Sequence, residues 1–199
     1  MVAYIVVAIL SYLIGSINFS IIISKKVAGF DVREKGSGNA GTTNMLRTVG
    51  KKAALITLVC DILKGVISIL LALLIGKIAK EANNSILVQI AGILVIIGHT
   101  FPIFFKFKGG KGVATAVGVL LTTNWQIGLI CLIFGLVLIA LTRMVSLGSI
   151  TAAILFPILV LFIKTNYIVE GNYFIYSLII AVMVCLLYTS PSPRDRGWS

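Results

Sequence analysis

The chain has 199 residues, of which 59% are hydrophobic and 12% are charged, with a formal net charge of +11 at pH 7. The charged share is about half that of a typical soluble domain, and a soluble fold of this length could not bury so much apolar side chain. The composition therefore predicts an all-α integral membrane protein, because only helices and closed barrels satisfy their backbone in lipid. Barrel strands would alternate apolar and polar residues, which the run Ile5–Ile14 does not do.

Cysteine, histidine and acidic residues are few and scattered. The three cysteines, Cys60, Cys131 and Cys185, all lie in apolar segments, which argues against a disulfide framework and a cysteine metal site. The chain has one histidine and six acidic residues, and these are widely separated in the sequence, so we do not expect a metal centre. We expect no metal, no cofactor and no nucleic-acid partner, and the sequence predicts no particular oligomeric state.

Seven apolar segments follow one another along the chain and predict a bundle of about seven transmembrane helices. The fourth has only about ten apolar residues, too few for a straight crossing, so we expect a half-helix or a tilted helix there. All seven belong to one domain, residues 1–188, and residues 189–199 have the composition of a disordered or foreign tail. The expected spans are Val2–Ser24, Ala53–Gly76, Ser85–Gly98, a short one ending near Thr123, Trp125–Leu141, Val145–Ile163 and Tyr173–Tyr188.

The loop between the first two spans, Phe30–Gly50, is polar and rich in glycine. Its glycines can adopt positive φ and turn successive amides toward one anion, and its polar side chains add hydrogen-bonding groups and one forked cation. This pattern predicts capture of a phosphorylated compound, with a flexible linker as the alternative. The residues concerned are Gly36, Ser37, Gly38, Asn39, Gly41, Thr42, Thr43, Asn44 and Arg47.

The same glycines match the dinucleotide fingerprint GxGxxG, but their context does not. A long apolar span precedes them where the motif needs a buried strand, and no acidic residue follows about twenty positions later. The sequence therefore does not predict a nicotinamide site.

Two ionisable residues lie inside the second span, and the single histidine ends the third. Asp61 and Lys64 are three residues apart, so they share a helix face and are expected to form a mutually neutralising pair. His99 is a candidate base, with an interfacial hydrogen-bonding role as the alternative. It does not begin an HxxxxD acyltransferase motif, because position 104 is Phe, and no Ser-His-Asp set for nucleophilic catalysis can be assembled.

A second glycine-rich, cationic loop precedes the short fourth span. Its glycines allow close backbone approach, and the helix expected after it would offer free N–H groups to an anion. It is not a Walker A loop, because Phe105 and Gly112 stand where that motif needs Gly and Ser or Thr. The alternative is a basic turn that binds anionic lipid headgroups. The residues concerned are Lys108, Gly109, Gly110, Lys111 and Gly112.

Cations are distributed unequally between the two sets of loops. One set holds eleven Lys and Arg residues, including both glycine-rich loops and Arg143, whereas the other holds only Lys77, Lys80 and Lys164. By the positive-inside rule the first set is cytoplasmic, with the N-terminus outside and the C-terminus inside. Both glycine-rich loops are thus expected on one membrane face, where they could share a polyanionic ligand.

Three segments together resemble one family, namely GSGNAGTTN at 36–44 followed by Arg47, GHTFP at 98–102 and FKGGKGVAT at 107–115. The chain is similar over roughly residues 1–187 to the PlsY family, bacterial membrane glycerol-3-phosphate acyltransferases that use acyl phosphate. The resemblance implies a multi-pass enzyme of the bacterial inner membrane, with its site facing the cytoplasm. The implied reaction is acyl transfer to the sn-1 hydroxyl of glycerol 3-phosphate, which gives lysophosphatidic acid for phospholipid synthesis.

The resemblance also implies roles for the residues of both loops. Ser37, Arg47, Lys111 and Ser149 are the implied catalytic residues. Ser37 would hold the acyl phosphate with Gly38, Asn39, Thr43 and the loop amides, whereas the other three would hold glycerol 3-phosphate, although this division stays open. A substrate phosphate could itself accept the proton, which would fit the lack of an obvious protein base.

The tail departs from the family pattern. After the last span the family carries a His-Arg-x-Asn segment associated with glycerol 3-phosphate binding, whereas this chain reads TSPSPRDRGWS from residue 189. We expect truncation and replacement there. Two other functions compete with the enzyme: a small transporter of an organic phosphate, and a lipid-binding membrane scaffold. Missing repeats and cations confined to one face count against the transporter.

Overall fold

The computed structural model describes residues 1–80, 83–163 and 172–189, and every regular element in these ranges is helical. Two single 3₁₀ turns, Val32–Glu34 and Ile103–Phe105, lie in the loops. The α-helices are α1 Val2–Ser16, α2 Phe19–Ala28, α3 Thr42–Thr48, α4 Lys51–Ala79, α5 Asn84–Thr100, α6 Val113–Thr123, α7 Trp125–Thr142, α8 Val145–Phe162 and α9 Tyr173–Thr189. The expected tail falls outside the described residues, apart from the end of α9.

All seven predicted apolar segments are helical. By length and composition, five helical segments are long and apolar enough to cross a membrane: Val2–Ala28, Lys51–Ala79, Asn84–Phe105, Trp125–Thr142 and Val145–Phe162. The two that complete the predicted seven, Val113–Thr123 and Tyr173–Tyr188, are apolar but shorter. The structure thus confirms a helical membrane protein, and α6 is the short helix that the sequence predicts.

The first span is broken, which the sequence prediction of one helix over Val2–Ser24 missed. α1 ends at Ser16, Ile17 and Asn18 are extended, and α2 begins at Phe19. Asn18 caps α2, because its Oδ1 accepts hydrogen bonds from the Ile21 amide at 3.2 Å and the Ser20 hydroxyl at 2.7 Å. A side-chain cap of this kind competes with continuation of the helix.

Close helix crossings explain several glycines within the spans. α1 packs against α5, α4 packs against α5 and α6, and α8 packs against α7 and α9. At the α1–α5 crossing a Cβ on Gly15 would overlap the Val95 carbonyl, and at the α4–α6 crossing a Cβ on Gly118 would overlap the Ile62 carbonyl. Small residues let membrane helices approach in this way.

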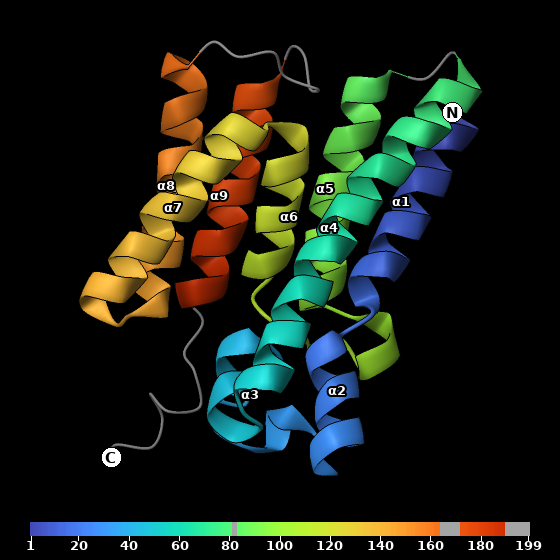
Figure 1. Cartoon of the computed structure of the whole chain (residues 1–199). Helices are drawn as coiled ribbons and strands as arrows, with labels where there is room; N and C mark the ends of the chain where they lie inside the picture. The colour runs from blue at the N-terminus through green and yellow to red at the C-terminus, as the bar shows by residue number, and fades with distance from the viewer. Residues whose placement is uncertain (81–82, 164–171, 190–199) are drawn as a thin grey trace.

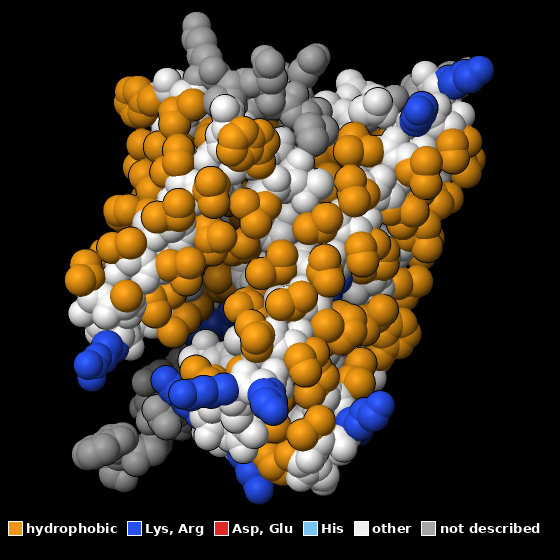
Figure 2. Space-filling model, in the orientation of Figure 1, with side chains coloured by type: hydrophobic (Ala, Val, Ile, Leu, Met, Phe, Trp, Pro, Cys, Tyr) orange, Lys and Arg blue, Asp and Glu red, His pale blue; other side chains and the backbone are white. Residues whose placement is uncertain are grey.

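The surface has the polarity of a membrane protein. α4 alone exposes a row of large apolar side chains, including Leu55, Leu63, Ile67, Leu70 and Leu74. Figure 2 shows hydrophobic side chains across the middle of one face, with Lys and Arg gathered mainly at one end. That end carries α2 and α3, opposite the N-terminus (Figure 1). Such an apolar belt between charged ends fits a lipid bilayer.

Candidate active site

A cavity of about 450 Å³ opens at the end of the bundle where the two glycine-rich loops meet. Residues from both loops line it, together with side chains from α4 to α9. A hollow is visible on this side of the molecule in Figure 2. Eight of the sixteen residues that the sequence predicts for the site line the cavity: Asn39, Gly41, Thr42, Thr43, His99, Lys111, Gly112 and Ser149.

The cavity has two chemically different parts. Near the loops its wall holds polar and charged residues, among them Asn39, Thr43 and Lys111. Away from the loops the wall is apolar, and α7 and α8 supply Cys131, Leu132, Gly135, Leu136, Ile139 and Ala152. A compound with an anionic head and a hydrocarbon tail would match both parts.

Asn44 organises the first loop from within. Its buried Nδ2 donates to the carbonyls of Val32 at 2.8 Å and Lys35 at 2.9 Å, and its Oδ1 accepts from the Ser37 amide at 3.0 Å. Gly36 adopts φ 62°, and a Cβ there would overlap Asn44 Oδ1, so the turn requires glycine. The Asn44 amide group is fully used inside the loop, so we infer that it supports the loop rather than contacting a phosphate.

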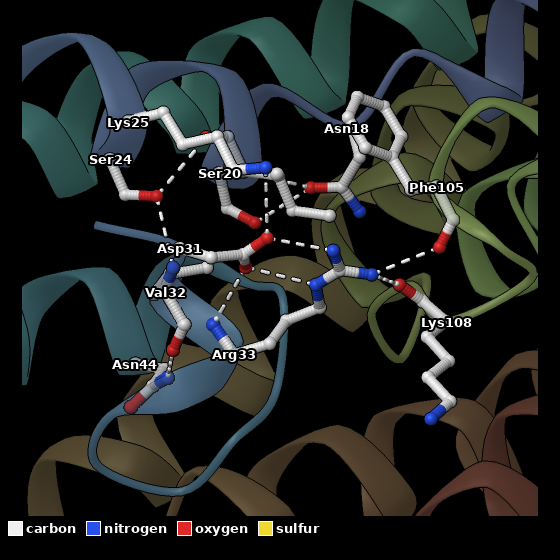
Figure 3. A network of polar contacts seen from close by, with 11 residues as sticks. Asn18, Ser20, Ser24, Lys25, Asp31, Val32, Arg33, Asn44, Phe105 and Lys108 are labelled. Carbon is white, nitrogen blue, oxygen red and sulfur yellow. Dashed lines mark hydrogen bonds and ion pairs between the residues drawn. The ribbon is translucent and has the colours of Figure 1, made fainter. Parts of the chain in front are cut away.

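Arg33 joins the two loops, a role that its sequence position, as one of several cations in the first loop, does not predict. Its Nη1 donates to the carbonyls of Phe105 at 2.9 Å and Lys108 at 3.0 Å, while Nε and Nη2 donate to Asp31 (Figure 3). Hydrogen bonds from Arg33 hold the pKa of the Asp31 carboxyl well below its ordinary value of 3.8, against the opposing effect of burial. The ion pair therefore stays charged at neutral pH and fixes one loop relative to the other.

The second loop is anchored to the end of α5. The Gly109 amide donates to the Thr100 carbonyl at 3.0 Å, and the Gly110 amide donates to the His99 carbonyl at 3.1 Å. These two amides are thus already used. Gly112 caps α6 with φ 71°, and the first turn of α6 lines the cavity, so the free N–H groups of this turn lie at the cavity wall, where such groups favour an anion.

Lys111 and Ser149, which are distant in sequence, come together through Tyr188, which is not among the predicted site residues. Lys111 Nζ lies 4.1 Å from the centre of the Tyr188 ring, a cation–π distance. The Tyr188 hydroxyl contacts Ser149 Oγ at 3.1 Å, and Ser149 Oγ donates to the Val145 carbonyl at 2.8 Å. Lys111, Tyr188 and Ser149 therefore form one edge of the cavity.

The remaining predicted residues lie outside the cavity lining. Ser37 and Gly38 lie in the first loop, and Arg47 and Lys108 have exposed side chains. Their contacts with substrate stay predictions. Among the described residues no group of three His, Cys, Asp or Glu side chains could hold a metal ion.

The predicted pair of Asp61 and Lys64 is confirmed, and His99 joins it. Lys64 Nζ lies 2.9 Å from Asp61 Oδ1 and 2.8 Å from His99 Nδ1. All three residues are buried, and Asp61 and His99 line the cavity. A compact ionic cluster thus forms part of the cavity wall near both loops.

Comparisons with known proteins agree on one family. The sequence model of the family described as glycerol-3-phosphate acyltransferase matches residues 5–194. A glycerol-3-phosphate acyltransferase of Thermoanaerobacter sp. (strain X514) is 45% identical over 188 residues, which cover 94% of this chain and 89% of the relative. Another, of Clostridioides difficile (strain 630), is 41% identical over 164 residues, covering 82% of this chain and 80% of the relative.

Solved structures of PlsY (YgiH), an integral membrane glycerol 3-phosphate acyltransferase, have the same fold. The glycerol 3-phosphate form superposes with a TM-score of 0.80 at 34% identity, covering 97% of this chain and 89% of that one. The lysophosphatidic acid form gives a TM-score of 0.77 at 34% identity, covering 94% and 88%. The chain described here belongs to the glycerol-3-phosphate acyltransferase family, of the PlsY type.

Proposed function

We propose that this chain transfers a fatty acyl group from acyl phosphate to the sn-1 hydroxyl of glycerol 3-phosphate. The observation that carries the proposal is the cavity itself, which joins a polar region between two glycine-rich loops to an apolar wall from α7 and α8. Both substrates carry a phosphate, and the donor also carries a hydrocarbon chain. The similar PlsY structures are described as glycerol 3-phosphate and lysophosphatidic acid forms, which name an acceptor and a product of this chemistry.

The transfer needs no covalent intermediate with the protein. The hydroxyl oxygen of glycerol 3-phosphate attacks the carbonyl carbon of the acyl phosphate, the new ester C–O bond forms, and the bond from that carbon to the phosphate oxygen breaks. Phosphate leaves and takes up the hydroxyl proton. Because the mixed anhydride is already activated, alignment of the two substrates and neutralisation of their charge suffice for catalysis. In this proposal Lys111 and the N-terminus of α6 neutralise charge, and Asn39 and Thr43 form hydrogen bonds; the support is that all of them line the cavity.

We further propose that the cavity faces the cytoplasm, in the inner membrane of a bacterium. We also propose that all seven apolar segments cross the bilayer, where α1 and α2 together count as one segment. The support is the asymmetry of the cations together with the position of α2 and α3 at the end opposite the N-terminus (Figure 1). Placing both loops on the cytoplasmic side would give them direct access to the soluble acceptor.

Cysteine labelling tests this orientation. Lys35→Cys and Lys108→Cys should react with a membrane-impermeant maleimide only from the cytoplasmic side, and Lys80→Cys only from outside, because these three side chains are exposed at opposite ends. The parent chain, whose Cys60, Cys131 and Cys185 lie within helices, is the control. Labelling of positions 35 and 108 from opposite sides would contradict a shared site.

The activity is tested with purified protein in detergent, supplied with acyl phosphate and labelled glycerol 3-phosphate. We expect labelled lysophosphatidic acid that forms only when both substrates are present. The rival transporter is tested with the protein in sealed liposomes. Uptake of glycerol 3-phosphate without any acylated product would replace the enzyme with the transporter.

A separate prediction concerns the tail. Pro191, Pro193 and the arginines that follow lie outside the described residues, but their sequence predicts that a helix does not continue through them. We therefore expect that Arg194 and Arg196 do not replace a His-Arg-x-Asn segment. We expect that replacing the residues after Leu187 with the C-terminal segment of a relative raises the steady-state rate at least tenfold, because catalysis depends on aiming the hydroxyl within about 3–3.5 Å of the carbonyl. Equal rates at matched protein levels would show that the segment is dispensable.

A further inference from the structure

The buried cluster of Asp61, Lys64 and His99 also holds the break between α1 and α2. Lys64 Nζ donates to the carbonyls of Gly15 at 3.1 Å and Ile17 at 3.0 Å, the carbonyls freed where α1 ends. Its third close partner is His99 Nδ1 at 2.8 Å. An ammonium group has three N–H donors and no acceptor, so these three contacts use all of them. Asp61 Oδ1 lies 2.9 Å from Lys64 Nζ and neutralises the positive charge of the ammonium group, but it does not accept a well-directed hydrogen bond.

This arrangement determines which nitrogen of His99 carries the proton. Lys64 can only donate, so His99 Nδ1 must be the acceptor in their contact. A proton on Nδ1 would point at the ammonium, and Asp61 Oδ1, at 3.6 Å, is too distant to accept it. The imidazole is therefore neutral and carries its proton on Nε2.

Nε2 lies where the two loops touch. A Cβ added to Gly110 would overlap both His99 Nε2 and the carbonyl oxygen of Ala40, so Gly110 of the second loop lies against this nitrogen and against the backbone of the first loop. His99 lines the cavity, and no hydrogen bond to its Nε2 exists among the residues that the structure describes. Because Lys64 holds Nδ1, Nε2 is the nitrogen of this buried side chain that is left to donate to a group bound in the cavity.

We propose that His99 binds a phosphate oxygen of a substrate through Nε2–H, and that Lys64 is the positioning residue that fixes this tautomer. His99 is then a donor rather than the base considered from the sequence, and one cluster sets both the break in the first span and the direction of the donor. Donation to phosphate rests on the proposed function, whereas the tautomer does not. The phosphate belongs to acyl phosphate or to glycerol 3-phosphate, which share this chemistry.

The tautomer can be read directly, because His99 is the only histidine of the chain. Protein labelled with ¹⁵N-imidazole histidine, purified through a tag without histidine, should show a pyridine-like Nδ1 and a pyrrole-like Nε2–H before any substrate is added. A pyrrole-like Nδ1 would overturn the proposal. This spectrum does not depend on turnover, so it tests the tautomer of His99 separately from the acyltransferase activity.

Two probes identify the source of the phosphate. Glycerol 3-phosphate and a non-hydrolysable acyl phosphonate are added separately. The probe whose oxygen accepts the hydrogen bond should shift the Nε2–H resonance, whereas glycerol at the same concentration should not. Saturating binding of both probes, measured by calorimetry, with an unchanged Nε2–H resonance would overturn the donation step.

Two amide substitutions separate donation from support of the fold. In His99→Asn the side-chain amide reaches about as far as Nδ1 of histidine, so its oxygen can still accept a hydrogen bond from Lys64. In His99→Gln the amide reaches about as far as Nε2, so its NH₂ group can still donate a hydrogen bond into the cavity. We expect His99→Asn to lose roughly ten- to a hundredfold in kcat/KM while melting close to the parent, because a hydrogen bond to a charged group is lost. His99→Gln should keep more activity but melt lower. Equal or higher activity of a folded His99→Asn variant would contradict the proposal.

Discussion

Lys111→Met is expected to lower kcat/KM by roughly 30- to 1,000-fold while the protein still folds and inserts. Lys111 lies in the cavity wall, at the junction of the second loop with α6. A charge-assisted contact with a phosphate in a partly dry site contributes about 2–4 kcal/mol to the transition state, which corresponds to that loss of rate. The measurement is the steady-state rate of lysophosphatidic acid formation at matched protein levels.

Lys52→Met is the matched control for this substitution. Lys52 is an exposed lysine at the start of α4 and does not line the cavity. Removing it takes the same charge from the same end of the molecule, so we expect a rate within about twofold of the parent, as for a screened surface charge. A Lys111→Met rate as high as that of the control would remove Lys111 from the mechanism.

Lys64→Met is expected to cause the largest loss of stability, about 3–5 kcal/mol in the free energy of unfolding. The substitution leaves Asp61, which is 1% exposed, as an uncompensated charge in the interior. It also removes the donor to the carbonyls of Gly15 and Ile17 at the helix break. Unfolding of the purified protein in a mild detergent would measure the loss.

A double substitution and a control locate the cause. Asp61→Asn combined with Lys64→Met removes both charges, so it should recover part of the lost stability if the stranded carboxylate is responsible. Lys77→Met changes an exposed lysine in the last turn of the same helix and should alter stability by less than about 0.5 kcal/mol. A loss below about 1 kcal/mol for Lys64→Met would show that the buried pair does not hold the fold.

The helices were predictable from the sequence, whereas the break in the first span was not. Long apolar runs require helices in lipid whatever their neighbours are, and even the short α6 follows from its ten or so apolar residues. The break depends instead on Asn18, whose side chain caps α2, and on Lys64, which reaches it from another helix. Hydrophobicity along the chain does not report a tertiary contact of this kind.

For the site, the sequence predicts the chemistry better than the positions of individual groups. Glycines, polar side chains and cations in two loops predict phosphate binding, and the structure brings both loops to one cavity. Which atoms face the cavity depends on packing. The Asn44 side-chain amide forms its hydrogen bonds within its own loop, and the Arg47 side chain is exposed. Arg33, in contrast, links the two loops by hydrogen bonds. The spacing of Asp31 and Arg33, two residues apart with opposite charges, was the available signal for that ion pair.

The central claim is that one cavity holds both phosphates and transfers the acyl group directly between them. The measurement is the initial rate of lysophosphatidic acid formation by the purified chain over a grid of acyl phosphate and glycerol 3-phosphate concentrations. Direct transfer within a ternary complex predicts intersecting double-reciprocal lines and no exchange of labelled phosphate into acyl phosphate when glycerol 3-phosphate is absent. Parallel lines with such exchange would reveal an acyl-enzyme, and the absence of lysophosphatidic acid would contradict the proposed function altogether.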